Sequence, residues 1–72
     1  MTLIRLNDNS NTVINLNNIE YMNLGYTENR NPCYTIQIGF ISGNTKQLIY
    51  DQKNMDTFEE DVKYISGFMF SR

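Results

Sequence analysis

The hydrophobic pattern of this chain changes period once, near Met55, and that change limits the folds open to it. Before it, apolar residues alternate with polar ones, most clearly over residues 34–41, which is typical of a half-buried strand. After it, apolar residues recur at every third or fourth position, which is typical of an amphipathic helix. The helical series is Phe58, Val62, Ile65 and Met69. We therefore expect an α+β protein in which a single helix follows the strands.

Polar turns divide the first part of the chain into about five strands. The expected strands cover residues 2–6, 12–16, 19–27, 34–41 and 45–50. We expect an antiparallel β-meander, with the C-terminal helix packed on one face of it. That face is expected to carry Tyr34, Ile36, Ile38 and Phe40. The segment 19–27 has apolar residues on both faces, which indicates either a central strand or a strand at an interface.

The helix is expected over residues 55–66. Gly67 is a typical residue for ending a helix, so residues 67–72 are expected to form a tail. Near the other end of the chain, Asp8 begins a polar segment whose spacing is distantly similar to a calcium loop. Such a loop needs Gly at its sixth position, where this chain has Val13, so we interpret the segment as a turn.

Seventy-two residues make one domain, 1–72, with a thin core. Cys33 is the only cysteine, so the chain cannot form an internal disulfide, and either the core suffices or self-association completes it. We expect a homo-oligomer, most simply a homodimer. The lone cysteine is typical of a reducing compartment, and the sequence shows neither a signal peptide nor a membrane span. A cytoplasmic location is therefore expected.

The composition argues against catalysis. The chain has no histidine and only one cysteine, the residues on which acid–base chemistry and zinc sites most often depend. It also has no glycine-rich phosphate loop, nucleophile elbow or thiol pair. We expect no enzyme activity, and no catalytic, cofactor-binding or metal-binding residues.

Acidic residues gather at the start of the expected helix. The first explanation is structural, because carboxylates in a first helical turn favour the helix dipole. The second is functional, because an acidic surface fits a basic groove on a partner, including one that normally holds nucleic acid. On the functional interpretation, the contacting residues are Asp56, Glu59, Glu60 and Asp61.

Aromatic residues are numerous for so small a core, and Tyr26, Phe68 and Phe70 are the ones expected to be partly exposed. Tyr and Phe are common anchors in protein interfaces. For Phe68 and Phe70 the structural alternative is that they wrap the open edge of the sheet. An aromatic sheet face can also stack single-stranded bases, but the six Lys and Arg residues are scattered and the net charge is −2, which disfavours nucleic acid.

The segments Leu3-Ile4-Arg5-Leu6-Asn7 and Val13-Ile14-Asn15-Leu16, followed by Ile19-Glu20, resemble the opening of the FlbD-like small flagellar-operon proteins. The resemblance covers about the first 20 residues. It departs from that family at Asp8, where the family favours Gly, and in the longer loop around Pro32. It implies a cytoplasmic role in support of motility, with no catalytic residues. The short, acidic, Asn-rich chain also resembles small accessory proteins of phages and mobile elements, many of which bind and block a host or defence protein.

Taken together, these features favour a non-catalytic protein-binding module. The leading hypothesis is a phage-type inhibitor of a host or defence protein, which would act in the host cytoplasm through the acidic helix and the aromatic surface. The alternative is a structural or regulatory accessory subunit of a bacterial assembly, of the flagellar type. Single-stranded nucleic-acid binding is the third hypothesis.

Overall fold

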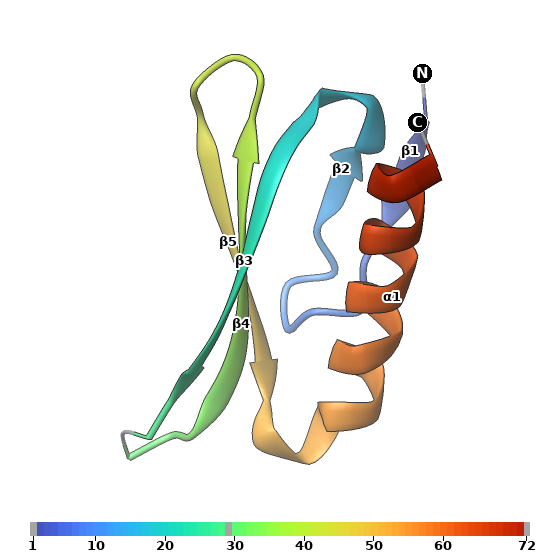
Figure 1. The fold of residues 1–72 in the computed structure, drawn as a ribbon. Coiled ribbons are helices and arrows are strands. Elements are labelled where there is room, and N and C mark those ends of the chain that lie inside the picture. The colour runs from blue at the N-terminus through green and yellow to red at the C-terminus, as the bar shows by residue number, and fades with distance from the viewer. Residues whose placement is uncertain (1, 29, 72) are drawn as a thin grey trace.

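The computed structural model describes residues 2–28 and 30–71 and has the expected α+β class, with five antiparallel strands followed by one helix (Figure 1). The elements are β1 (Leu3–Arg5), β2 (Val13–Asn15), β3 (Ile19–Thr27), β4 (Cys33–Phe40), β5 (Thr45–Asp51) and α1 (Met55–Ser71). Short 3₁₀ turns at Leu16–Asn18 and Gln52–Asn54 join β2 to β3 and β5 to α1.

The strands form two sheets and not one continuous meander. β1 pairs with β2 in a short hairpin, and β3, β4 and β5 form a separate antiparallel sheet in that order. The division falls at the turn Leu16–Asn18, where the Asn15 side chain accepts a hydrogen bond from the Asn17 backbone N–H. Leu16, within this turn, is fully buried and anchors the change of direction in the core. The short hairpin can therefore pack as a separate layer.

β3 lies at the edge of the three-stranded sheet, so of the two alternatives expected for this segment the central strand is wrong. Within the described residues it pairs with β4 alone, with a register shift between Ile19 and Tyr21. Beyond that shift, Met22 lies opposite Ile38, and Leu24 lies opposite Ile36. Opposed residues share a face of a sheet, so the even-numbered residues of β3 are on the side that α1 covers.

α1 is longer than expected, because it continues through Gly67 to Ser71. Gly67 does not take the left-handed backbone conformation, so it does not end the helix. Phe68 and Met69 pack against the buried core, and that contact explains why the last turns remain helical. The expectation of a tail over residues 67–72 was therefore wrong for residues 67–71, which are helical. Arg72 lies outside the described residues. Among those residues, no helix has the length and hydropathy needed to cross a membrane.

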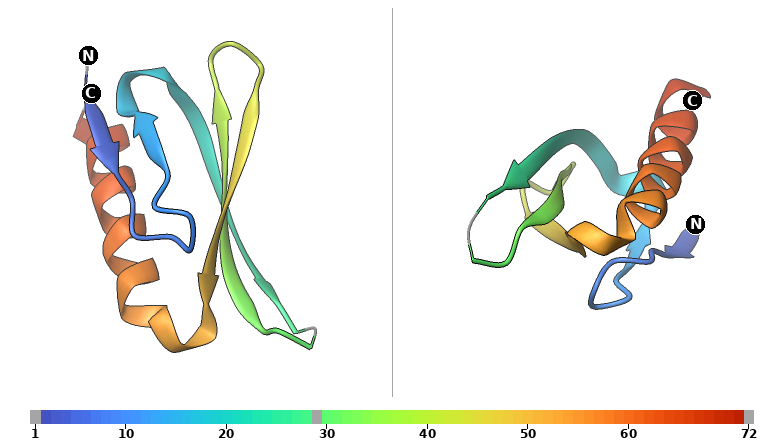
Figure 2. Two further views of the ribbon diagram at one scale, coloured as in Figure 1. Left: turned by 180° about the vertical axis from the view of Figure 1, so that it is seen from behind. Right: turned by 90° about the horizontal axis from the view of Figure 1, so that it is seen from below.

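The core lies between the sheet and a second layer made of α1 and the β1–β2 hairpin (Figure 2). As expected, the face of β4 that carries Ile36 and Ile38 is the one buried under α1. The buried apolar residues are Leu6, Ile14, Leu16, Ile19, Ile36, Ile38, Leu48, Tyr50, Phe58 and Ile65.

The second layer covers the sheet unevenly. The hairpin lies on the β5 side of α1, and the Asn9 backbone N–H donates to the Ile49 carbonyl oxygen at 2.9 Å. On the other side α1 faces β3, with the end of the helix level with the start of the strand (Figure 1). Figure 1 draws β2 between them, and the view from below in Figure 2 shows that the hairpin lies on the β5 side of α1. Leu24 and Tyr26 of β3 remain exposed although they lie on the face that α1 covers, so the side between β3 and α1 is the open side of the molecule.

Candidate functional site

The four acidic residues expected to form one partner surface point in different directions. Successive residues on a helix are about 100° apart, so a run of three acids cannot share a face. Phe58 and Ile65 face the core, and Asp61 is three residues from one and four from the other. Asp61 is accordingly buried, with 5% of its surface exposed. Its assignment to an exposed acidic surface was wrong.

Asp61 instead joins three parts of the chain. Its Oδ2 accepts hydrogen bonds from the Tyr50 hydroxyl at 2.6 Å and from the Asn7 backbone N–H at 2.8 Å. Its Oδ1 accepts from the Asn7 side-chain amide at 3.2 Å. These bonds link α1, β5 and the loop after β1. Burial and the hydrogen bond to Asp61 raise the pKa of Tyr50 well above its usual value of 10, so Tyr50 is a constant donor at neutral pH.

The other three acids are exposed, but they divide between two sides of α1. Asp56 and Glu60 are four residues apart and lie in one row. Glu60 also borders a cavity of about 340 Å³ between β1 and α1, together with Arg5 and Tyr64. Glu59 lies in another row, which begins at Met55 and continues to Phe70 through the three- and four-residue spacing of the helix.

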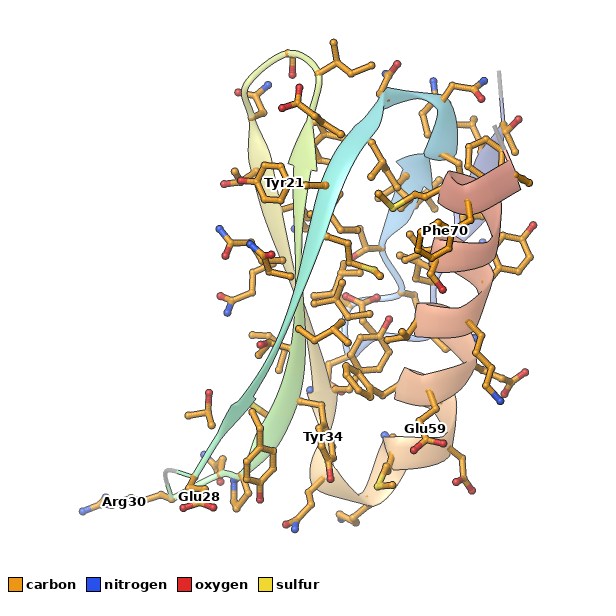
Figure 3. All side chains as sticks on the ribbon, viewed as in Figure 1. Tyr21, Glu28, Arg30, Tyr34, Glu59 and Phe70 are labelled. Atoms are coloured by element: carbon orange, nitrogen blue, oxygen red, sulfur yellow. The ribbon has the colours of Figure 1, made fainter. Side chains whose placement is uncertain are left out.

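The three aromatic residues also have different positions. Phe70 is 89% exposed, and Figure 3 shows it on the same side of α1 as Glu59. Tyr26, on β3, is 43% exposed. Phe68 is half-buried and packs against the core, so the structural interpretation applies to Phe68 and not to Phe70.

A series of aromatic contacts connects Tyr26 to the core. Its ring centroid is 4.9 Å from that of Tyr34, which is stacked at 4.9 Å on Phe58. Phe58 meets Tyr50 edge to face at 5.5 Å. The Tyr34 hydroxyl also lies 3.4 Å from the Met55 sulfur. An exposed residue of β3 is thus held by packed rings and not by a mobile loop.

Three of the exposed candidate residues, Tyr26, Glu59 and Phe70, lie around the open side. Two exposed apolar residues that the sequence did not single out accompany them: Leu24 of β3, 53% exposed, and Met55 of α1, 44% exposed. We call this set the open face; it consists of Leu24, Tyr26, Met55, Glu59 and Phe70. The signal that could have identified Leu24 is the apolar character of both faces of its strand.

The described residues hold no group of three or more His, Cys, Asp or Glu side chains placed to bind a metal ion. Their buried side-chain nitrogen and oxygen atoms all have hydrogen-bond partners. Asp8, from the segment with distant similarity to a calcium loop, accepts from the Thr12 backbone and hydroxyl, both at 2.7 Å, and forms the expected turn.

The open face is therefore a combination of exposed apolar side chains and one carboxylate, presented by β3 and α1. No protein-family model matches this sequence, and comparisons with characterised proteins and with solved structures found no significant match.

Proposed function

We propose that this chain is a non-catalytic protein-binding module whose docking surface is the open face. The observation that carries the proposal is that four exposed apolar residues, Leu24, Tyr26, Met55 and Phe70, lie along β3 and α1 on the open side. Single exposed apolar residues are ordinary, but a continuous group of them marks interaction sites. Contacts from Tyr26 through Tyr34 to Met55 connect β3 with the start of α1, and Phe70 lies about four turns further along the same side of the helix.

Phe70 supports the proposal most strongly among single residues. An 89% exposed phenylalanine on an ordered helix leaves a large apolar area in water that the fold does not use. Aromatic residues of this kind are frequent hot spots in interfaces. Phe68, two residues earlier, is packed, so the exposure of Phe70 is not a general property of the end of the helix.

The charge of the open face indicates what partner fits. Glu59 lies in the same helical row as Met55 and Phe70 and is the carboxylate of the open face. A partner with an apolar pocket bordered by Lys or Arg would complement this surface. The module would act by occupying a site on its partner, as an inhibitor of a host or defence protein does. An accessory subunit of a bacterial assembly would use the same surface in the same way.

The experiment is partner capture followed by calorimetry with the purified partner. Phe70→Ala is expected to weaken binding at least tenfold, and Glu59→Lys is expected to weaken it and to reverse its salt dependence. Leu3→Ala is the matched control, because Leu3 is 60% exposed but lies on β1, away from the open face. Equal affinities for the wild type and the Phe70→Ala protein would reject the proposed surface.

A further inference from the structure

We propose that β3 pairs antiparallel with β3 of a second copy of this chain, so that two open faces join into one groove. The pairing is argued from the edge of β3 itself. Only the use of the groove by another protein rests on the proposed function.

The first argument is the direction of the backbone groups of β3. The Phe40 N–H donates to the Asn44 carbonyl, so the backbone groups of Phe40 point toward β5. Directions alternate along a strand, so those of Gly39 point toward β3 and its partner Tyr21. The same alternation directs the N–H and C=O groups of Met22, Leu24 and Tyr26 away from β4, toward the free edge.

The far edge of the sheet confirms this alternation. Ile49 of β5 lies opposite Thr35, and the same rule directs its backbone groups away from β4. Its carbonyl does accept the Asn9 N–H at 2.9 Å. The loop after β1 thus covers part of the β5 edge, whereas no described segment covers β3.

The second argument is the composition of the strand. Edge strands that avoid pairing usually carry Lys or Pro, or an inward-pointing charge. Residues 19–27 contain no Lys, Arg or Pro. Their only charged residue is Glu20, which lies at the register shift. Two copies of residues 21–27 can therefore approach without repulsion between like charges. Leu24 and Tyr26, which have free backbone groups, also have exposed apolar side chains.

A second copy of β3 can pair all of these outward-directed groups. A two-fold axis beside Leu24 places it opposite Leu24 of the second copy and Met22 opposite Tyr26. In this register the three outward-directed residues of one β3 form hydrogen-bonded pairs with those of the other. The two three-stranded sheets then join into one sheet of six strands. An axis perpendicular to the sheet keeps both helices on the same face. The groove then has Leu24 and Tyr26 as its floor and the two rows of Met55, Glu59 and Phe70 as its walls.

The area available predicts a weak dimer. Of the open face, only Leu24 and Tyr26 lie beside the two-fold axis, and their exposed parts amount to roughly 190 Å² per copy, taking about 200 Å² for a fully exposed side chain of this size. Standard interfaces bury about 800 Å² per partner. We therefore expect self-association to depend on concentration.

The test is sedimentation equilibrium of the purified chain from low micromolar to millimolar concentration. The wild type is expected to approach twice the 8.5 kDa chain mass. Leu24→Lys is expected to remain a monomer, because two ammonium groups would meet at the axis. Leu3→Lys is the control at a similarly exposed residue, and it is expected to dimerise as the wild type does.

A cross-linking experiment tests the register. With Cys33 replaced by Ser, Leu24→Cys is expected to give a dimer with a short bismaleimide reagent, and Leu3→Cys is expected to give none. A wild type that remains monomeric at millimolar concentration would overturn the pairing, and so would dimers that persist in the Leu24→Lys protein. Neither result concerns the Phe70-dependent binding of another protein, so the two proposals can fail separately.

Discussion

At the scale of single residues, Asp61 shows how a carboxylate in an acidic run can belong to the core. It lies at i+3 from Phe58 and i−4 from Ile65, on the stripe that the apolar period places inside. That spacing is visible in the sequence and could have separated Asp61 from Glu59 and Glu60. The partners of Asp61 could not be predicted, because Asn7 is 54 residues away along the chain.

Asp61→Ala is expected to destabilise the fold by about 1–3 kcal/mol, because it leaves the Tyr50 hydroxyl and the Asn7 N–H without their acceptor. Urea unfolding, followed by circular dichroism, measures this change. The neighbouring Glu60→Ala is the control and is expected to change stability by less than about 0.5 kcal/mol. Equal losses in the two variants would refute the role assigned to Asp61.

The raised pKa of Tyr50 predicts that the folded protein loses stability at alkaline pH. The Tyr50 pKa is raised in the folded protein, so above pH 10 the folded state keeps a proton that the unfolded state has released. Stability is therefore unaffected below about pH 10 and falls above it, with a slope that approaches about 1.4 kcal/mol per pH unit.

Tyr50→Phe tests this prediction. The variant is less stable at neutral pH, because Asp61 loses the hydroxyl donor and keeps only the two donors of Asn7, but its free energy of unfolding should fall less steeply above pH 10. Urea midpoints at a series of pH values give both slopes. Parallel slopes for the two proteins would contradict the assignment.

At the scale of elements, the change of hydrophobic period predicts the strands and the helix, but local signals mislead at their ends. Gly67 is a common helix terminator, yet packing of Phe68 and Met69 on the core outweighs its low helix propensity. Similarly, apolar residues on both faces of the segment 19–27 are compatible with a central strand and with an edge strand, so the pattern could not predict which one forms. Strand order depends on contacts distant in sequence, which periodicity does not contain.

The extended end of α1 predicts unequal effects for its two phenylalanines. Phe68→Ala is expected to lower stability by about 1–3 kcal/mol, because it removes a half-buried side chain from the core. Phe70→Ala is expected to cost less than about 0.5 kcal/mol. Chemical denaturation compares them, and a larger loss for Phe70→Ala would mean that Phe70 packs against the fold and is not available to a partner.

The outer face of the sheet depends on the pair Tyr21 and Gly39, which lie opposite each other on β3 and β4. A Cβ atom at Gly39 would overlap the Tyr21 ring, and Gly39 is buried under it. Gly39→Ala is expected to cost about 1–3 kcal/mol in the wild-type background. In a Tyr21→Ala background the cost should fall markedly, which a double-mutant cycle of unfolding free energies would show. An unchanged cost would exclude steric overlap as the cause.

At the scale of the whole molecule, the uneven second layer determines what the protein can present to others. The hairpin and α1 together cover the β5 side of the sheet, and the side next to β3 stays open (Figure 2). The sequence could predict a helix packed on strands, because each element has a clear apolar face. It could not predict the open side, since that follows from the separation of the hairpin into its own sheet.

The same arrangement explains why some of the candidate residues are brought together and others are not. Tyr26 comes from β3, and Glu59 and Phe70 come from α1; Figure 1 shows that β3 begins beside the end of α1 and runs away from the helix toward its other end. Asp61 and Phe68 are on the same helix but face the core side.

The most direct test of this account is a residue-by-residue map of amide chemical shifts in the labelled protein, recorded with and without its captured and purified partner. The account predicts that the largest changes fall on the open face, at Leu24, Tyr26, Met55, Glu59 and Phe70. It predicts small changes at Leu3 and Val13 of the hairpin. Changes confined to the hairpin, or to Tyr21 and Ile49 on the outer face of the sheet, would contradict it.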